Sequence, residues 1–153
     1  MVTIKKKPEP PGGKKPQLSD FSVEDILARV IWGEAEGEGD DGMQAVGNVI
    51  MNRVDVESKY DADAENIVMA RAQFSSIDDP VRLEAMMNLT NDNPEYIQAL
   101  EISKKLLTGE MKDITGGATH FYNPNTANMD EEWIKKYPVT FKLKNHWFAK
   151  GAF

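Results

Sequence analysis

The stretch Ile31-Trp32-Gly33-Glu34-Ala35-Glu36-Gly37-Glu38-Gly39-Asp40 joins an apolar segment to a run of acidic residues spaced by glycine. Burial disfavours the ionised form of a carboxyl group, so a glutamate that closely follows Trp32 is suited to donate a proton. The glycines bare the backbone around these carboxylates and let a ligand approach closely. Glu34 is therefore the first catalytic candidate. A solvated acidic surface loop is the alternative interpretation.

Composition excludes several kinds of site. The chain of 153 residues has no cysteine, which excludes disulfides, thiolate nucleophiles and zinc ribbons. Its two histidines, His120 and His146, allow at most a metal site of two histidines and a carboxylate, and we expect no metal and no cofactor. No apolar run reaches the roughly 18 residues that a membrane span needs.

Charge is distributed unevenly along the chain. Residues 1–16 carry five lysines and one glutamate, whereas the remainder carries 13 basic and 24 acidic side chains. A body with this excess of negative charge argues against nucleic acid as a partner, because phosphate binding needs clustered lysine and arginine.

The first 18 residues are rich in lysine and proline and offer little apolar area to bury, so we expect a disordered leader. They lack the apolar core and the cleavage site of a signal peptide. Residues 19–153 are expected to form one catalytic domain, monomeric and without a membrane span. Absence of a signal peptide favours a phage-encoded protein, released from the host cytoplasm to the cell wall or carried in the virion.

Apolar periodicity and end signals predict an α+β domain that is mainly helical. Ser22 can cap a first helix that carries Glu34 at its C-terminal end, and Gly109 can end the last long one. Met86 and Met87 are expected to fill the core. The helices are expected at about 22–34, 40–54, 64–70, from Pro80 onward, and 94–107; two strands are expected at 139–143 and 146–148, around a turn at 144–145.

The segment 115–125 interleaves hydrogen-bonding side chains with aromatic ones and is expected to be a loop. This composition is typical of a sugar-binding cleft, in which rings pack on aromatic faces and polar side chains bind hydroxyl and amide groups. A purely structural loop is the alternative. The residues that would bind sugar are Thr119, His120, Phe121, Tyr122 and Asn123.

These motifs, in their order along the chain, resemble the SleB-type cell-wall hydrolases. The matching segments are Leu27–Ala35, Gly37-Glu38, Gly42–Val46, Asn52–Val54, Gln73-Phe74-Ser75, Gly116–Pro124, and His146 with Phe148. The resemblance covers about residues 22–150. It implies a lysozyme-like, mainly helical fold with a small antiparallel β element.

The resemblance also implies that the chain acts on the glycan strands of peptidoglycan and that Glu34 is the catalytic acid. Two positions depart from the family pattern, since Glu36 stands where an arginine is frequent and Ser76-Ile77 follows Phe74-Ser75 without the usual aromatic residue. The residues expected to bind substrate are Glu38, Gln73, Phe74, Ser75, Thr119, His120, Phe121, Tyr122 and Asn123.

The predicted reaction is cleavage of the β-1,4 bond between N-acetylmuramic acid and N-acetylglucosamine by a lytic transglycosylase. A hydrolytic muramidase needs a second carboxylate across the sugar. The other acidic residues of the 34–41 stretch follow Glu34 too closely to oppose it. Two alternatives stay open: a metal-dependent N-acetylmuramoyl-L-alanine amidase that uses His120, His146 and a carboxylate, and a non-catalytic glycan-binding virion protein.

Overall fold

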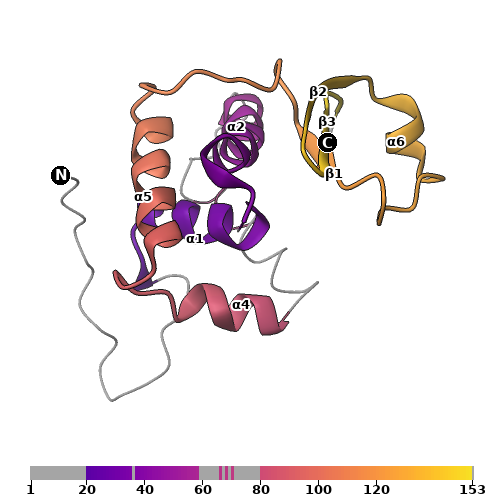
Figure 1. Cartoon of the computed structure of the whole chain (residues 1–153). Coiled ribbons are helices and arrows are strands. Elements are labelled where there is room, and N and C mark those ends of the chain that lie inside the picture. The colour runs from indigo at the N-terminus through magenta and orange to yellow at the C-terminus, as the bar shows by residue number, and fades with distance from the viewer. Residues whose placement is uncertain are drawn as a thin grey trace.

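The computed structural model describes residues 20–35, 37–58, 66, 68, 70 and 80–152. Of the elements that this part of the chain forms, helices α1, α2, α4 and α5 lie together, and a three-stranded sheet lies with the short helix α6 (Figure 1). Among the described residues, no helix combines the length and the apolar character that crossing a membrane requires. The elements are α1 Val23–Ala35, α2 Gly39–Ser58, α4 Pro80–Met87, α5 Pro94–Leu107, β1 His120–Tyr122, α6 Glu132–Lys136, β2 Val139–Leu143 and β3 His146–Ala149.

The ends of the helices follow the local signals in the sequence. Ser22 Oγ accepts a hydrogen bond from the Asp25 N–H at 3.3 Å, and Asn93 Oδ1 accepts one from the Tyr96 N–H at 3.0 Å. These bonds satisfy first-turn donors that would otherwise lack a partner. Gly109 follows α5 with a φ of +77°, as expected for the residue that ends a helix.

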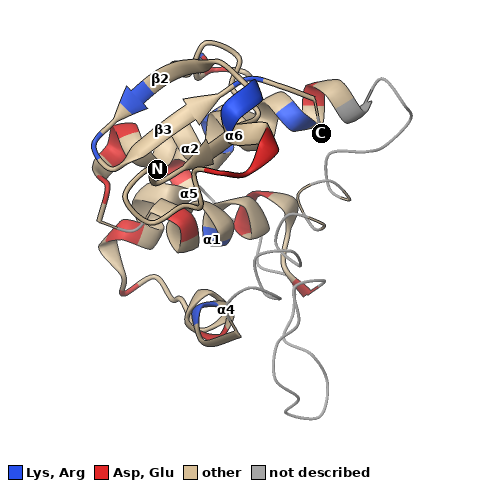
Figure 2. Ribbon diagram, turned by 90° about the vertical axis from the view of Figure 1, so that its right-hand side faces the viewer, with Lys and Arg blue, Asp and Glu red and all other residues tan. Residues whose placement is uncertain are grey.

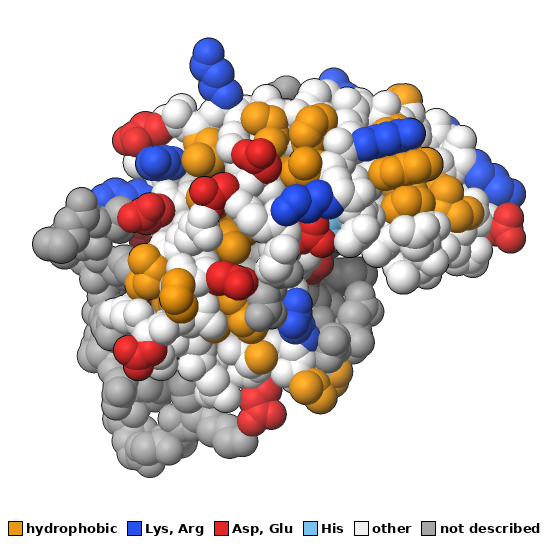
Figure 3. Space-filling view, viewed as in Figure 1, with side chains coloured by type: hydrophobic (Ala, Val, Ile, Leu, Met, Phe, Trp, Pro, Cys, Tyr) orange, Lys and Arg blue, Asp and Glu red, His pale blue; other side chains and the backbone are white. Residues whose placement is uncertain are grey.

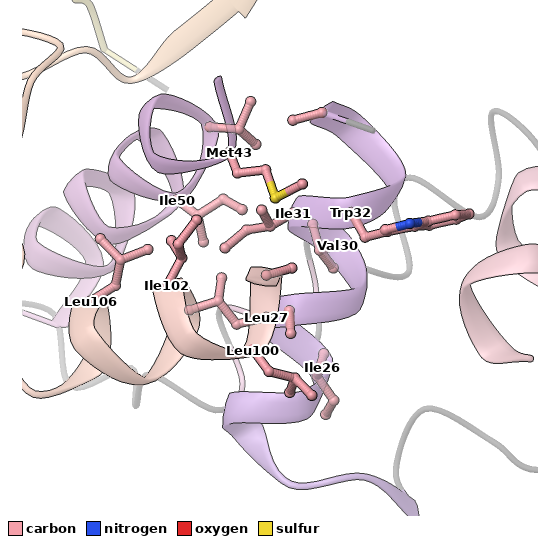
Figure 4. Close-up of a cluster of buried hydrophobic side chains, with 14 of the residues drawn as sticks. Ile26, Leu27, Val30, Ile31, Trp32, Met43, Ile50, Leu100, Ile102 and Leu106 are labelled. Atoms are coloured by element: carbon pink, nitrogen blue, oxygen red, sulfur yellow. The ribbon is translucent and has the colours of Figure 1, made fainter. Parts of the chain in front are cut away.

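Helix α1 lies at the centre of the main core and packs against α2, α4 and α5. Figure 4 shows Leu27 and Ile31 converging with side chains of α2 and α5, whereas Trp32 points away from them. Gly47 lets the helices approach, because a Cβ atom there would lie 3.1 Å from Ile31 Cδ1. The fully buried members of α1 are Ile26, Leu27, Ala28, Val30 and Ile31.

The sheet has the strand order β1-β3-β2, with both pairings antiparallel. The two strands expected around the turn at 144–145 are confirmed. The expectation of a loop throughout 115–125 is wrong, because His120–Tyr122 forms β1. This strand exists through its pairing with β3, more than 20 residues away, and such pairing leaves no signal in the local pattern.

Other differences concern the helices. Helix α2 starts at Gly39 and continues to Ser58, beyond the expected end at Val54. In α4 only Met86 is buried, whereas Val81 is 79% exposed and Met87 is only partly buried. Helix α6 was not expected, since five residues are too short to show a periodic pattern. Most of the helix expected at 64–70 lies outside the described residues. Within that range only residues 66, 68 and 70 are described, and all three are helical.

Candidate active site

Glu34 lies in the last turn of α1, where the apolar helix gives way to the acidic loop. Its side chain is partly buried. The chain then turns through Gly37 and Gly39, whose φ angles of +82° and +77° are rarely adopted by residues with a side chain. The glycines that were expected to bare the backbone thus make the tight connection between α1 and α2.

Helix α4 packs directly against the end of α1. A side chain at Gly33 would displace Met86, because a Cβ atom there would lie 2.5 Å from Met86 Sδ. Arg82 Nε donates to the Gly33 carbonyl at 2.8 Å, and the Arg82 guanidinium carbon lies 5.3 Å from the centre of the Trp32 ring. These contacts fix the backbone immediately before Glu34.

The loop after Glu34 is held from two further directions. The Gly37 N–H donates to Glu95 Oε2, in the first turn of α5, at 3.3 Å. Lys144 Nζ, in the turn between β2 and β3, donates to the Glu38 carbonyl at 2.6 Å. Lys144 therefore connects the sheet to the acidic loop between α1 and α2.

A buried charged cluster joins the N-terminal half of α1 to α4 and α5. Arg29 is 5% exposed; its Nε donates to Asp25 Oδ1 at 2.9 Å, and its Nη1 donates to the Met86 carbonyl at 2.7 Å. Tyr96 donates to Asp25 and accepts from Arg29 Nη2 at 3.2 Å. Burial, and then the bond to Asp25, raises the pKa of Tyr96, so its hydroxyl remains a donor. In the sequence, the sign of this buried cluster was Arg29, a charged residue inside an apolar run.

Two residues of α2 hold the segment that leads into β1. Asn52 Nδ2 donates to the Ala118 carbonyl at 2.9 Å and to Asp113 Oδ2 at 3.1 Å. Arg53 Nε donates to the Thr119 carbonyl at 2.6 Å. The Asn52-Arg53 motif therefore joins the helices to the sheet.

The register of the sheet separates the aromatic residues of the Gly116–Pro124 motif. Phe121 pairs with Phe148, their ring centroids 5.9 Å apart, on the face that packs against Ala45 and Val49 of α2. Neighbouring residues in a strand point to opposite faces. His120 accordingly lies on the other face, 5.0 Å from the Trp133 ring of α6.

The predicted substrate-binding residues are therefore distributed over several places. Glu38 is partly buried in the acidic loop, and Phe121 lies on the α2 face of the sheet. Thr119 is buried, and its hydroxyl donates to the Gly151 carbonyl at 2.8 Å. Asn123 Oδ1 accepts from the Asn125 N–H at 2.9 Å. Tyr122 lies with His120 on the α6 face, and burial raises its pKa. Glu36, Gln73, Phe74, Ser75, Ser76 and Ile77 lie outside the described residues.

The two histidines lie on opposite faces of the sheet. His146 contacts Phe121 and Phe148 on the α2 face, at 5.4 and 6.4 Å between ring centroids, whereas His120 contacts α6. The sheet thus separates the two ligands that the amidase alternative requires to meet. Among the described residues, no group of three or more acidic and histidine side chains is placed to hold a metal ion.

Sequence reasoning assigned His146 a role only as a metal ligand of the amidase alternative, and it assigned none to Lys144. Both lie at the end of the hairpin that reaches the acidic loop, and His146 faces the helices. Figure 3 shows acidic side chains and a histidine next to one another at the surface where the helical part and the sheet part meet. In the sequence, His146 and Phe148 form the last segment of the family resemblance. Their position relative to Glu34 depends on the sheet.

Comparison with solved structures gives two extensive matches. The catalytic domain of the germination-specific lytic transglycosylase SleB from Bacillus anthracis aligns with a TM-score of 0.62 and 26% sequence identity, covering 92% of this chain and 99% of that one. The catalytic domain of the Bacillus cereus SleB protein aligns with a TM-score of 0.61 and 27% identity, covering 91% of this chain and all of that one. The expected fold, mainly helical with a small antiparallel sheet, is confirmed.

Comparison with curated sequences gives the same kind of relatives. A spore cortex-lytic enzyme of Bacillus cereus is 28% identical over 93% of this chain, which spans about half the length of that relative. The cell wall hydrolase CwlJ of Halalkalibacterium halodurans is 34% identical, with 74% of this chain matching 75% of that protein.

Comparison with protein families matches residues 37–149 to the family described as Cell Wall Hydrolase. The match begins three residues after Glu34 and ends with β3, so it spans α2, α5 and the whole sheet. It covers well over half of the chain. Together with the relatives above, it shows that the chain belongs to the cell wall hydrolase family.

Proposed function

We propose that the chain degrades peptidoglycan as a lytic transglycosylase, with Glu34 as its acid and base. The observation that carries the proposal is the match to a solved catalytic domain of a lytic transglycosylase over 99% of its length. The position of Glu34 agrees with this chemistry, because a partly buried carboxyl group on a backbone fixed by α4 and α5 is suited to deliver a proton in one direction.

The reaction requires two proton transfers at one carboxyl group. Glu34 in its acid form protonates the glycosidic oxygen as the bond to C1 of N-acetylmuramic acid breaks, which releases the 4-hydroxyl of N-acetylglucosamine. The Glu34 carboxylate then accepts the proton of the muramic acid 6-hydroxyl while its oxygen bonds to C1. A 1,6-anhydro ring forms, no water is consumed, and Glu34 returns to its acid form.

The arrangement of the nearby carboxylates favours this reaction over hydrolysis. An opposing carboxylate would have to stand across the sugar from Glu34. Asp40 and Asp41 are exposed in the first turn of α2, and Glu38 sits on the same short connection as Glu34. All three closely follow Glu34 in the chain, so we expect them to approach a bound sugar from the same side as Glu34.

Product analysis tests the proposal. Wild type and Glu34→Gln are incubated with purified sacculi, and the released muropeptides are identified by mass spectrometry. We expect wild type to release 1,6-anhydro products and Glu34→Gln to lose at least about 100-fold in rate, the usual contribution of a general acid. Glu101→Gln, which makes the same change at an exposed position of α5, is the matched control.

Three results would contradict the proposal. Muropeptides with a reducing muramic acid would indicate hydrolysis, and free stem peptides that disappear with a chelator would indicate the amidase. Wild type that binds sacculi and releases nothing would indicate a non-catalytic glycan-binding protein.

A further inference from the structure

The face of the sheet that lies away from α2 carries a group of aromatic rings. Trp133 and Tyr137 come from α6 and its C-terminal end, and Trp147 comes from β3. Tyr122 of β1 joins them, with its ring centroid 5.5 Å from Trp133 and 6.1 Å from Trp147. Tyr122 is buried, whereas Trp133, Tyr137 and Trp147 are all partly exposed.

Helix α6 covers only part of this face. Its single buried residue is Ile134, which packs with Tyr122 and Ala149. Trp147 lies on the central strand, and Lys142 Nζ of the neighbouring β2 stands 4.0 Å from the centre of the Trp147 ring. Figure 3 shows hydrophobic side chains at the surface of the sheet part with a basic side chain laid across them.

The charge of this part is opposite to that of the rest of the molecule. Residues 131–152 contain five lysines and two glutamates, whereas residues 20–130 contain eight basic and 22 acidic side chains. Figure 2 shows basic residues on β2 and on α6. The aromatic surface, with Lys142 beside it, therefore lies on a basic part of a molecule that is otherwise acidic.

This combination suits a sugar polymer that carries carboxylates. The flat face of a tryptophan packs against the C–H groups of a pyranose ring, and its rigid side chain loses little entropy on binding. A protonated lysine beside it attracts anionic groups and aligns them with the surface. Peptidoglycan offers both features, since its glycan strands carry N-acetylated sugars and its stem peptides end in carboxylates.

We propose that Trp133, Tyr137, Lys142 and Trp147 form an aromatic surface that binds a peptidoglycan strand outside the catalytic region. Sugar rings pack on the parts of the tryptophan rings that reach the surface, and stem-peptide carboxylates contact Lys142. The proposal rests on the proposed function, which makes peptidoglycan the substrate. It adds a second point of attachment, which retains the protein on insoluble wall material between cleavage events.

Binding is measured by co-sedimentation with purified sacculi, in a Glu34→Gln background so that the wall stays intact. Lys142→Glu tests the charge and Trp147→Leu tests the ring. Lys105→Glu makes the same change of charge on exposed α5 and is the matched control. We expect Lys142→Glu and Trp147→Leu each to weaken binding about fivefold or more, and Lys105→Glu to change it less than about twofold.

A second measurement separates attachment from catalysis. In the chain with Glu34 intact, Lys142→Glu should slow digestion of sacculi while leaving the rate on a soluble two-disaccharide fragment unchanged. If Lys142→Glu binds sacculi as well as Lys105→Glu does, the inference is overturned, even if wild type releases anhydro products. If wild type releases none and Lys142→Glu still loses binding, the proposed function fails and the aromatic surface stands. Should Trp147→Leu fail to fold, Lys142→Glu decides alone.

Discussion

At the scale of single residues, the buried Arg29 shows how one charge can hold several elements together. Arg29 donates to Asp25 within α1, to the Met86 carbonyl of α4 and to the Tyr96 hydroxyl of α5. Removing one partner of such a group leaves the other buried and unpaired. Arg29→Met should therefore destabilise the fold by about 3–5 kcal/mol, measured by urea denaturation.

The double variant shows whether the ion pair itself causes this loss. Arg29→Met combined with Asp25→Asn removes the uncompensated charge, so we expect it to recover part of the stability. A double variant that is less stable than Arg29→Met alone would contradict this explanation. Lys104→Met, on the exposed side of α5, is the control for loss of a positive charge.

Asp113 is a residue whose effect on stability depends on pH. Burial by itself would raise its pKa, but hydrogen bonds from Thr115, Asn52 and Gly117 outweigh burial and hold the pKa below its ordinary value. A lowered folded-state pKa stabilises the fold fully above the unfolded value of about 3.9, and this contribution is lost as the pH falls through the folded value.

The expected result is a stability difference between wild type and Asp113→Asn that is constant from pH 7 to about pH 5 and shrinks below about pH 4. Urea denaturation at pH 7, 5, 4 and 3 measures it, with Asp92→Asn in the exposed turn before α5 as the control. A difference that grows on acidification would show that the charge of Asp113 does not stabilise the loop.

At the scale of secondary-structure elements, the β2–β3 hairpin acts on the acidic loop through Lys144. The bond from Lys144 Nζ to the Glu38 carbonyl is exposed, so its loss should cost no more than about 1 kcal/mol of stability. Lys144→Met should nevertheless reduce the rate on sacculi severalfold, because the loop that follows Glu34 loses its contact with the sheet. Lys150→Met, on the same part of the molecule, is the control.

Amide hydrogen exchange distinguishes this effect from a general loss of stability. In Lys144→Met, faster exchange should be confined to residues 37–39 and the 144–145 turn, and α5 should be unchanged. A uniform rise in exchange would mean that Lys144 supports the fold as a whole.

The same elements show what the sequence could predict. Helices α1 and α5 were predictable because their caps, Ser22 and Asn93, act within one turn. Strand β1 was not predictable, since a short strand is stabilised by a distant partner. Helix α6 was not predictable because five residues are too short to show a periodic pattern. The candidate site divides in the same way: Glu34 follows from a local pattern, whereas the separation of His120 from His146 depends on strand register.

At the scale of the whole molecule, the helical part and the sheet part share one packed boundary. Phe148 of β3 is 1% exposed and packs with Ala45 and Val49 of α2, and Phe121 contacts both this cluster and the main core. A boundary packed in this way couples the two parts, because neither can open without exposing apolar surface of the other. We therefore expect them to unfold together.

Phe148→Ala tests this coupling. Truncating a buried phenylalanine leaves a cavity and should cost about 3–5 kcal/mol. If the parts unfold as one unit, the amides of β3 and those in the middle of α2 should lose the same free energy of protection in native-state hydrogen exchange. Loss confined to the sheet would show that it opens independently. Coupling has a functional consequence, because Lys144 then reaches the loop after Glu34 from a rigid support.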